Sequence, residues 1–249
     1  INLAICFVIE MNKYFQEKII IALDNSDITV LRKTVKKLGE SVSFYKIGLS
    51  SVFTGGLAFA KELQDEGKKI FLDLKLFDIE NTIVNSVLGI SHLNFDFITV
   101  HGDPNVVRAA VKGRKNKKTK ILAVTFLTSL NRNGLDLALI KKGRIESLVR
   151  ERARIAFNSG ADGVICSPID VRSVRRLDNA RNKIIVCPGI RPMGIGNNEQ
   201  KRVGAPAETL KAGADYLVIG RPITQSPNPL ETLTIITNDL QDKAVGRSG

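Results

Sequence analysis

From Phe71 to Thr82 the chain reads FLDLKLFDIENT. Its first six residues are an apolar run interrupted by two charges, which is typical of a strand buried on both faces of a parallel sheet. Asp73 and Lys75 are two residues apart, so on a strand both would point to the same face. Residues 79–91 then take helical spacing. The segment predicts a strand, a polar turn and a helix.

The same order of strand and helix recurs along the chain. We expect strands at residues 18–24, 42–48, 69–75, 95–101, 120–128, 162–167, 183–189 and 215–220. We expect helices at residues 28–38, 53–66, 79–91, 105–112, 146–158 and 229–240. Eight strands alternating with helices predict an α/β fold, a single-domain TIM (β/α)8 barrel rather than an open doubly wound sheet. Neither GxGxxG after the first strand nor GxxxxGK[ST] occurs.

No linker or change in composition divides the chain, so residues 12–249 are expected to form one catalytic domain. Residues 1–11 are largely apolar but lack the basic leader and cleavage site of a signal peptide. We expect them to be an N-terminal extension, non-native or disordered. No apolar run reaches the roughly 18 to 20 residues that cross a bilayer, so no membrane partner is expected.

The formal net charge of +12 fits nucleic acid, an acidic ligand or a basic proteome. The densest basic run, residues 112–120, contains no aromatic residue and joins a helix to a strand, which favours a solvated loop over a nucleic-acid site. The three cysteines, Cys6, Cys166 and Cys187, are widely spaced and form no CxxC pair. This pattern argues against a disulfide framework and against a zinc site. It indicates a cytoplasmic setting.

Polar residues stand at the carboxyl ends of the predicted strands, where barrels of this kind collect their chemistry. They are Asp24, Lys46, Asp73, Lys75, His101, Thr128, Ser129, Ser167, Arg191 and Arg221. Charges inside a barrel mouth need partners, and an alternating array of Asp and Lys, in which Asp78 and Lys46 join Asp73 and Lys75, would supply them. Nearby carboxylates would keep Lys75 cationic and fit it to donate a proton. The alternative is a purely structural ion-pair network.

The C-terminal third carries the features of a phosphate site. PGIRP contains Arg191, and GRPIT contains Gly220 and Arg221. The loops after the seventh and eighth strands of such barrels commonly bind phosphate through backbone N–H groups and a cation. Residues 193–200 are long and glycine-rich enough to act as a lid.

Taken together, these motifs resemble the orotidine 5'-phosphate decarboxylase family from residue 18 to about residue 224. The resemblance rests on ALD ending at Asp24, YKIG with Lys46, DLKLFDIENT, VTFLTS with Thr128 and Ser129, PGIRP, EQKRV with Gln200, and GRPIT. DxKxxD alone is shared with sugar-phosphate decarboxylases and synthases of the same superfamily. The full set in this order indicates the orotidylate branch.

The resemblance implies a role for each matched residue, and no metal or organic cofactor. Lys75 would protonate C6 of the pyrimidine after CO2 leaves, and Asp73 would face the substrate carboxylate. Asp78 and Thr82 would enter the neighbouring site of a homodimer. The remaining residues would bind substrate: Asp24 and Lys46 the ribose, Thr128 and Ser129 the pyrimidine edge, Gln200 from the lid, and Arg191, Gly220 and Arg221 the 5'-phosphate.

Two other readings stay open. One is a magnesium-dependent sugar-phosphate decarboxylase or hexulose-phosphate synthase on the same barrel. The other is a non-catalytic binder of a phosphate ligand or of nucleic acid.

Overall fold

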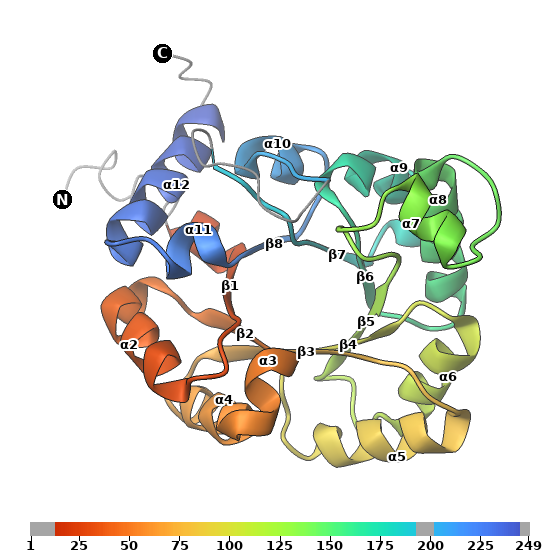
Figure 1. Cartoon of the computed structure of the whole chain (residues 1–249), viewed down its shortest axis with the longest axis horizontal. Coiled ribbons are helices and arrows are strands. Elements are labelled where there is room, and N and C mark those ends of the chain that lie inside the picture. Colours follow the sequence, from red (N-terminus) through yellow and green to blue (C-terminus); the bar gives the residue numbers. More distant parts are fainter. Residues whose placement is uncertain (1–12, 193–201, 245–249) are drawn as a thin grey trace.

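The computed structural model describes residues 13–192 and 202–244, and within them eight parallel strands close into a barrel (Figure 1). The strands pair in chain order and β1 pairs with β8. They are β1 Ile19–Leu23, β2 Phe44–Gly48, β3 Lys69–Leu76, β4 Phe97–His101, β5 Lys120–Val124, β6 Gly163–Ile165, β7 Ile184–Cys187 and β8 Tyr216–Ile219. The predicted fold class is confirmed.

Helices surround the barrel in Figure 1. They are α2 Ile28–Leu38, α3 Leu49–Ser51, α4 Leu57–Asp65, α5 Glu80–Ser91, α6 Pro104–Gly113, α7 Arg132–Leu137, α8 Ile145–Asn158, α9 Val171–Arg175, α10 Pro206–Lys211, α11 Arg221–Thr224 and α12 Pro229–Ala244. No helix in the described part of the chain is both long and apolar enough to span a membrane. The expected extension at residues 1–11 and the expected lid at residues 193–200 lie outside the described residues.

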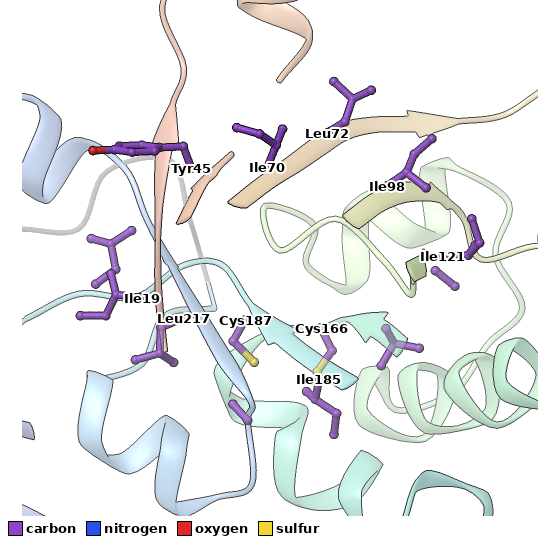
Figure 2. Close-up of a cluster of buried hydrophobic side chains, with 14 of the residues drawn as sticks. Ile19, Tyr45, Ile70, Leu72, Ile98, Ile121, Cys166, Ile185, Cys187 and Leu217 are labelled. Atoms are coloured by element: carbon purple, nitrogen blue, oxygen red, sulfur yellow. The ribbon is translucent and has the colours of Figure 1, made fainter. Parts of the chain in front are cut away.

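Alternation along the strands divides the core into two layers. In β1, Ile20 faces the barrel interior, whereas Ile19 and Ile21 pack outward beneath the helices. Figure 2 shows part of the outer layer, in which the free, buried Cys166 and Cys187 lie among aliphatic side chains. Both therefore pack as small hydrophobic side chains.

Aromatic rings fill the barrel interior. The ring of Phe97 lies 5.0 Å from that of Phe44, 5.9 Å from that of Phe71 and 5.3 Å from that of Tyr216, at the tilted or edge-on angles that aromatic pairs prefer. Phe71 also lines the cavity described below. The aromatic layer is therefore the apolar floor on which the polar side chains stand.

Two predicted elements are cut short by four residues at one end, and the helix expected at residues 229–240 runs on to Ala244. The helix expected at residues 53–66 is interrupted, because Thr54 and Gly55 leave helical geometry and Gly55 has a φ of 102°, a conformation suited to glycine. A regular helix resumes only at Leu57. The strand expected at residues 120–128 stops at Val124, and Leu127 is exposed, so the apolar residues that prolonged the prediction belong to a loop.

Candidate active site

Two carboxylates and two ammonium groups form a continuous ion-pair array at the carboxyl ends of the first three strands. Lys46 Nζ on β2 lies 2.7 Å from Asp24 Oδ1 and 3.4 Å from Asp73 Oδ2. Lys75 Nζ lies 2.8 Å from Asp73 Oδ1. The predicted array of alternating Asp and Lys is therefore present, with Asp73 between the two lysines and with Asp24, in place of the expected Asp78, as its second carboxylate.

Burial and pairing oppose each other in this array. Burial alone would lower the pKa of Lys46, but the carboxylates of Asp73 and Asp24 outweigh it and raise the pKa above its usual value. Burial would raise the pKa of Asp73, but Lys46 and Lys75, with hydrogen bonds from Lys75 and Thr99, lower it below the usual range. Both groups are therefore held in their charged forms at neutral pH.

The strand that carries Asp73 and Lys75 is not regular. The pairing of β3 with β4 shifts between Leu72 and Leu76, and Lys75 has a φ of 49°. A left-handed conformation costs a non-glycine residue about 1–2 kcal/mol. The side chains of Asp73 and Lys75 do come together, as expected. Simple alternation along a strand does not account for this, because a bulge changes the direction of Lys75.

Thr99 on β4 is a residue of the array that the sequence analysis missed. Its hydroxyl donates to Asp73 Oδ1 at 2.8 Å and accepts from the backbone N–H of Lys75 at 3.0 Å. The side chain is fully buried. Only the register of the two strands reveals it: Phe71 pairs with Phe97 and Leu72 with Ile98, so Thr99 follows opposite the segment that begins with Asp73.

A cavity of about 600 Å³ opens above this array. The predicted site residues that line it are Asp24, Lys46, Asp73, Lys75, Thr128, Arg191, Gly220 and Arg221. Gly48 lies beneath Asp24 and Lys46, and a Cβ there would come within 2.9 Å of Asp24 Oδ1 and 3.2 Å of Lys46 Nζ. A larger residue would displace Asp24 and Lys46, so steric crowding explains why YKIG ends in glycine.

The side of the cavity formed after β7 and β8 is basic. Burial, and next the positive charge of Arg221, holds the pKa of Arg191 below its usual value. Two guanidinium groups close enough to repel each other favour an anionic ligand that would relieve the repulsion. At Gly220 an added Cβ would lie in ordinary van der Waals contact with Ala22, 3.4 Å from its Cβ, so the backbone there is not crowded.

A buried ion pair supports the loop that carries Arg191. Arg202 Nη2 donates to both carboxylate oxygens of Asp170 at 2.5 Å, and the two side chains are 8% and 1% exposed. Burial raises the pKa of Asp170, and the guanidinium of Arg202 opposes that rise. The backbone N–H of Arg191 donates to Gly204 O at 3.0 Å. The two ends of the segment that holds residues 193–201 are thus fixed to the barrel.

The remaining predicted residues that the structure describes lie outside the cavity lining. Ser129 is exposed, whereas Thr128 beside it lines the cavity. Asp78 and Thr82 are exposed, and Asp78 accepts the N–H of Ile79 through Oδ1 at 2.7 Å. Gln200 lies outside the described residues.

Two polar strand ends proved to have other partners. His101 Nδ1 lies 2.5 Å from Asp103 Oδ2, which also accepts from Arg152 at 2.6 Å. Ser167 Oγ donates to Arg202 O at 2.9 Å. Neither His101 nor Ser167 lines the cavity. Their side chains instead form hydrogen bonds with neighbouring segments at the rim of the barrel.

The cavity also includes residues that the sequence analysis did not single out. Asn25, Ser50 and Gln225 contribute amide and hydroxyl groups from segments that follow β1, β2 and β8. Their one signal in the sequence is a position shortly after a strand end. Among the residues described, no cluster of three or more His, Cys, Asp or Glu side chains is arranged to hold a metal ion.

Comparison with known proteins gives a consistent result. Residues 17–236 match the family described as Orotidine 5'-phosphate decarboxylase / HUMPS family. Orotidine 5'-phosphate decarboxylase of Ruegeria pomeroyi is 50% identical over 231 residues, 92% of this chain and 96% of the relative. The enzyme of Jannaschia sp. is 49% identical, over 90% of this chain and 98% of its own. A crystal structure of orotidine 5'-phosphate decarboxylase from Lactobacillus acidophilus superposes with a TM-score of 0.76 and 32% identity, covering 89% of this chain and 98% of that one.

Proposed function

Because the chain belongs to the Orotidine 5'-phosphate decarboxylase / HUMPS family, we propose that it converts orotidine 5'-phosphate to uridine 5'-phosphate and CO2. This is the last step of de novo pyrimidine nucleotide synthesis. The observation that carries the proposal is that Asp73 and Lys75 face the same cavity as Arg191 and Arg221. One side of that cavity suits a carboxylate and a ring carbon, and the other suits a phosphate.

The reaction breaks the bond between C6 and the carboxylate and leaves the electron pair on C6. CO2 departs, and Lys75 Nζ then supplies the proton that forms the new C6–H bond. We propose that no metal or organic cofactor takes part, so fixed charges of the protein must stabilise the carbanion. Asp73, between two lysines, positions Lys75 and faces the departing carboxylate. Binding of the distant phosphate contributes free energy to the chemical step.

The other binding residues complete the substrate site. Asp24 and Lys46 hold the ribose hydroxyls, and Thr128 and Ser129 contact the pyrimidine edge. Gln200 reaches the substrate from the lid, and Arg191, Gly220 and Arg221 bind the phosphate. The positions of Asp24, Lys46 and Thr128 along the cavity support the first two assignments.

The decisive experiment is turnover of orotidine 5'-phosphate by the purified chain, with and without excess EDTA. Decarboxylation that survives chelation supports the proposal. Turnover lost on chelation and restored by Mg²⁺ would favour the sugar-phosphate branch of the family. No turnover, together with salt-sensitive retention on DNA, would favour a non-catalytic nucleic-acid binder.

We further propose that the enzyme is a cytoplasmic homodimer in which Asp78 and Thr82 complete the partner's site. Phe77 and Ile79, on either side of Asp78, are 66% and 72% exposed. Large apolar side chains exposed in one short segment support a covered protein surface. The free cysteines Cys166 and Cys187 suit a reducing compartment.

Mixing two inactive variants tests the shared site. Lys75→Ala and Asp78→Asn should each be inactive alone. After unfolding and refolding together, half of the dimers would be mixed and each would hold one intact site, so about a quarter of the wild-type activity should return. A mixture as inactive as its components would contradict the contribution of Asp78 across the interface.

A further inference from the structure

The bulge in β3 leaves one residue of β4 opposite three. Leu72 pairs with Ile98 and Leu76 pairs with Val100. Between these pairs β3 contains Asp73, Leu74 and Lys75, whereas β4 contains only Thr99. The regular ladder of backbone hydrogen bonds is interrupted at the place where the two central charged residues of the array stand.

The hydroxyl of Thr99 bridges this interruption. A threonine hydroxyl has one proton to donate and lone pairs to accept. Here the proton goes to Asp73 Oδ1 at 2.8 Å, and the oxygen accepts the backbone N–H of Lys75 at 3.0 Å. The same Asp73 Oδ1 also accepts from Lys75 Nζ at 2.8 Å. One buried hydroxyl therefore contacts both the carboxylate and the strained backbone beneath the ammonium.

We propose that Thr99 is a positioning residue, which fixes the carboxylate of Asp73 and the left-handed backbone of Lys75 in the arrangement that decarboxylation needs. The inference rests on the proposed function and adds a residue that acts through two others rather than on the substrate. A strained conformation persists only where its surroundings hold it. Thr99 holds this one from the neighbouring strand.

The groups facing Asp73 predict a pH signature. Lys46 faces it from β2 and Lys75 from β3, and Asp24 lies beyond Lys46. From β4 the contact is the Thr99 hydroxyl, which donates to the charged form of Asp73 and so helps to lower its pKa. Without that donor the pKa of Asp73 rises, and the acid limb of activity moves to higher pH.

The test compares Thr99→Val, which removes the hydroxyl at nearly constant shape, with Thr99→Ser, which keeps it. With orotidine 5'-phosphate we expect kcat of Thr99→Val to fall by about 10- to 100-fold, the size expected for losing a hydrogen bond to a charged group. Binding of uridine 5'-phosphate should change by less than about 3-fold, because the phosphate side is untouched. Thr99→Ser should restore most of kcat and the wild-type acid limb.

Thr125→Val is the matched control. Thr125 is also a buried barrel threonine, but its hydroxyl donates to the backbone carbonyl of Ile165 at 2.8 Å. It should lose some stability and keep the wild-type pH profile. If Thr99→Val does not fold, Thr99→Ala serves in its place with the same expectation.

A readout without turnover separates this inference from the proposed function. The titration of the Asp73 carboxyl, followed by 13C NMR, should move to higher pH in Thr99→Val whichever substrate the wild type accepts. An unchanged titration, a wild-type kcat, or an equal loss in Thr99→Ser would each overturn the role of Thr99. An inactive wild type with the expected titration shift would overturn the proposed function alone.

Discussion

The two sides of the cavity differ in the charges that they bring together. On the β1–β3 side two carboxylates and two ammonium groups pair with one another and cancel. On the β7–β8 side Arg191 and Arg221 place two positive charges near each other, and burial first, then the charge of Arg221, lowers the pKa of Arg191. The side proposed for chemistry is preorganised by the chain itself, whereas the side proposed for binding is arranged so that an anion improves it.

The largest effect should come from removing the ammonium of Lys75 on the β1–β3 side of the cavity. Lys75→Ala removes the proposed proton donor, which is also the ammonium proposed to stabilise the carbanion, so kcat should fall by at least about 10⁴-fold. Loss of CO2 from labelled orotidine 5'-phosphate measures it, and binding of uridine 5'-phosphate should stay close to wild type. Substantial residual decarboxylation would remove Lys75 from its role.

The next largest effect should come from breaking the buried Asp170–Arg202 ion pair behind the β7–β8 side of the cavity. Arg202→Met leaves Asp170 buried without its partner, which should cost about 3–5 kcal/mol in the free energy of unfolding, measured by urea denaturation. The double variant Asp170→Asn/Arg202→Met removes both charges and should recover part of the loss. If the single variant is as stable as the wild type, the pair does not hold this loop.

A smaller effect is expected from the basic side itself. Arg221→Ala should lower kcat/KM for orotidine 5'-phosphate by about 10²-fold, because charge-assisted contacts to the phosphate are lost. With orotidine, which has no phosphate, the variant and the wild type should differ little. An equal loss with both substrates would show that Arg221 does not act through the phosphate, and the comparison between the two sides would fail.

The smallest effect should be the pH dependence of stability that comes from the charged groups on the β1–β3 side. The pKa of Asp73 is lowered from 3.8, so its contribution to stability is present above that value and is lost as the pH falls below it. The pKa of Lys46 is raised from 10.5, so its contribution is present below that value and is lost as the pH rises further. Unfolding measurements across pH should show both losses. In Lys46→Met the acid loss should begin at higher pH, and an unchanged onset would contradict the coupling.

Sequence patterns predicted the barrel because parallel strands covered by helices must be apolar on both faces, a signal that survives without coordinates. They also located Asp24, Lys46, Asp73 and Lys75, because strand ends in such a barrel converge. Thr99 was missed because a lone threonine in an apolar strand is unremarkable until β3 and β4 are aligned. The break at Thr54 and Gly55 was missed because helical spacing continues across it.

Ser129, Asp78 and Thr82 mark a different limit. Their assignments came from family motifs, and within one chain all three are exposed. Asp78 and Thr82 would act in the site of a neighbouring subunit and Ser129 would contact a ligand, so the interactions that would fix their roles lie outside the single chain. These three stay predictions.

The bulge at Lys75 has a consequence for enzyme design. Searches for catalytic templates that match Asp-x-Lys on straight strands would retrieve many sites and miss the geometry seen here, because the ammonium is aimed by a backbone turn that the letters do not encode. The transferable unit is the bulged segment together with its opposing threonine. Transplanting the three-residue motif alone would give a surface ion pair instead of an oriented acid.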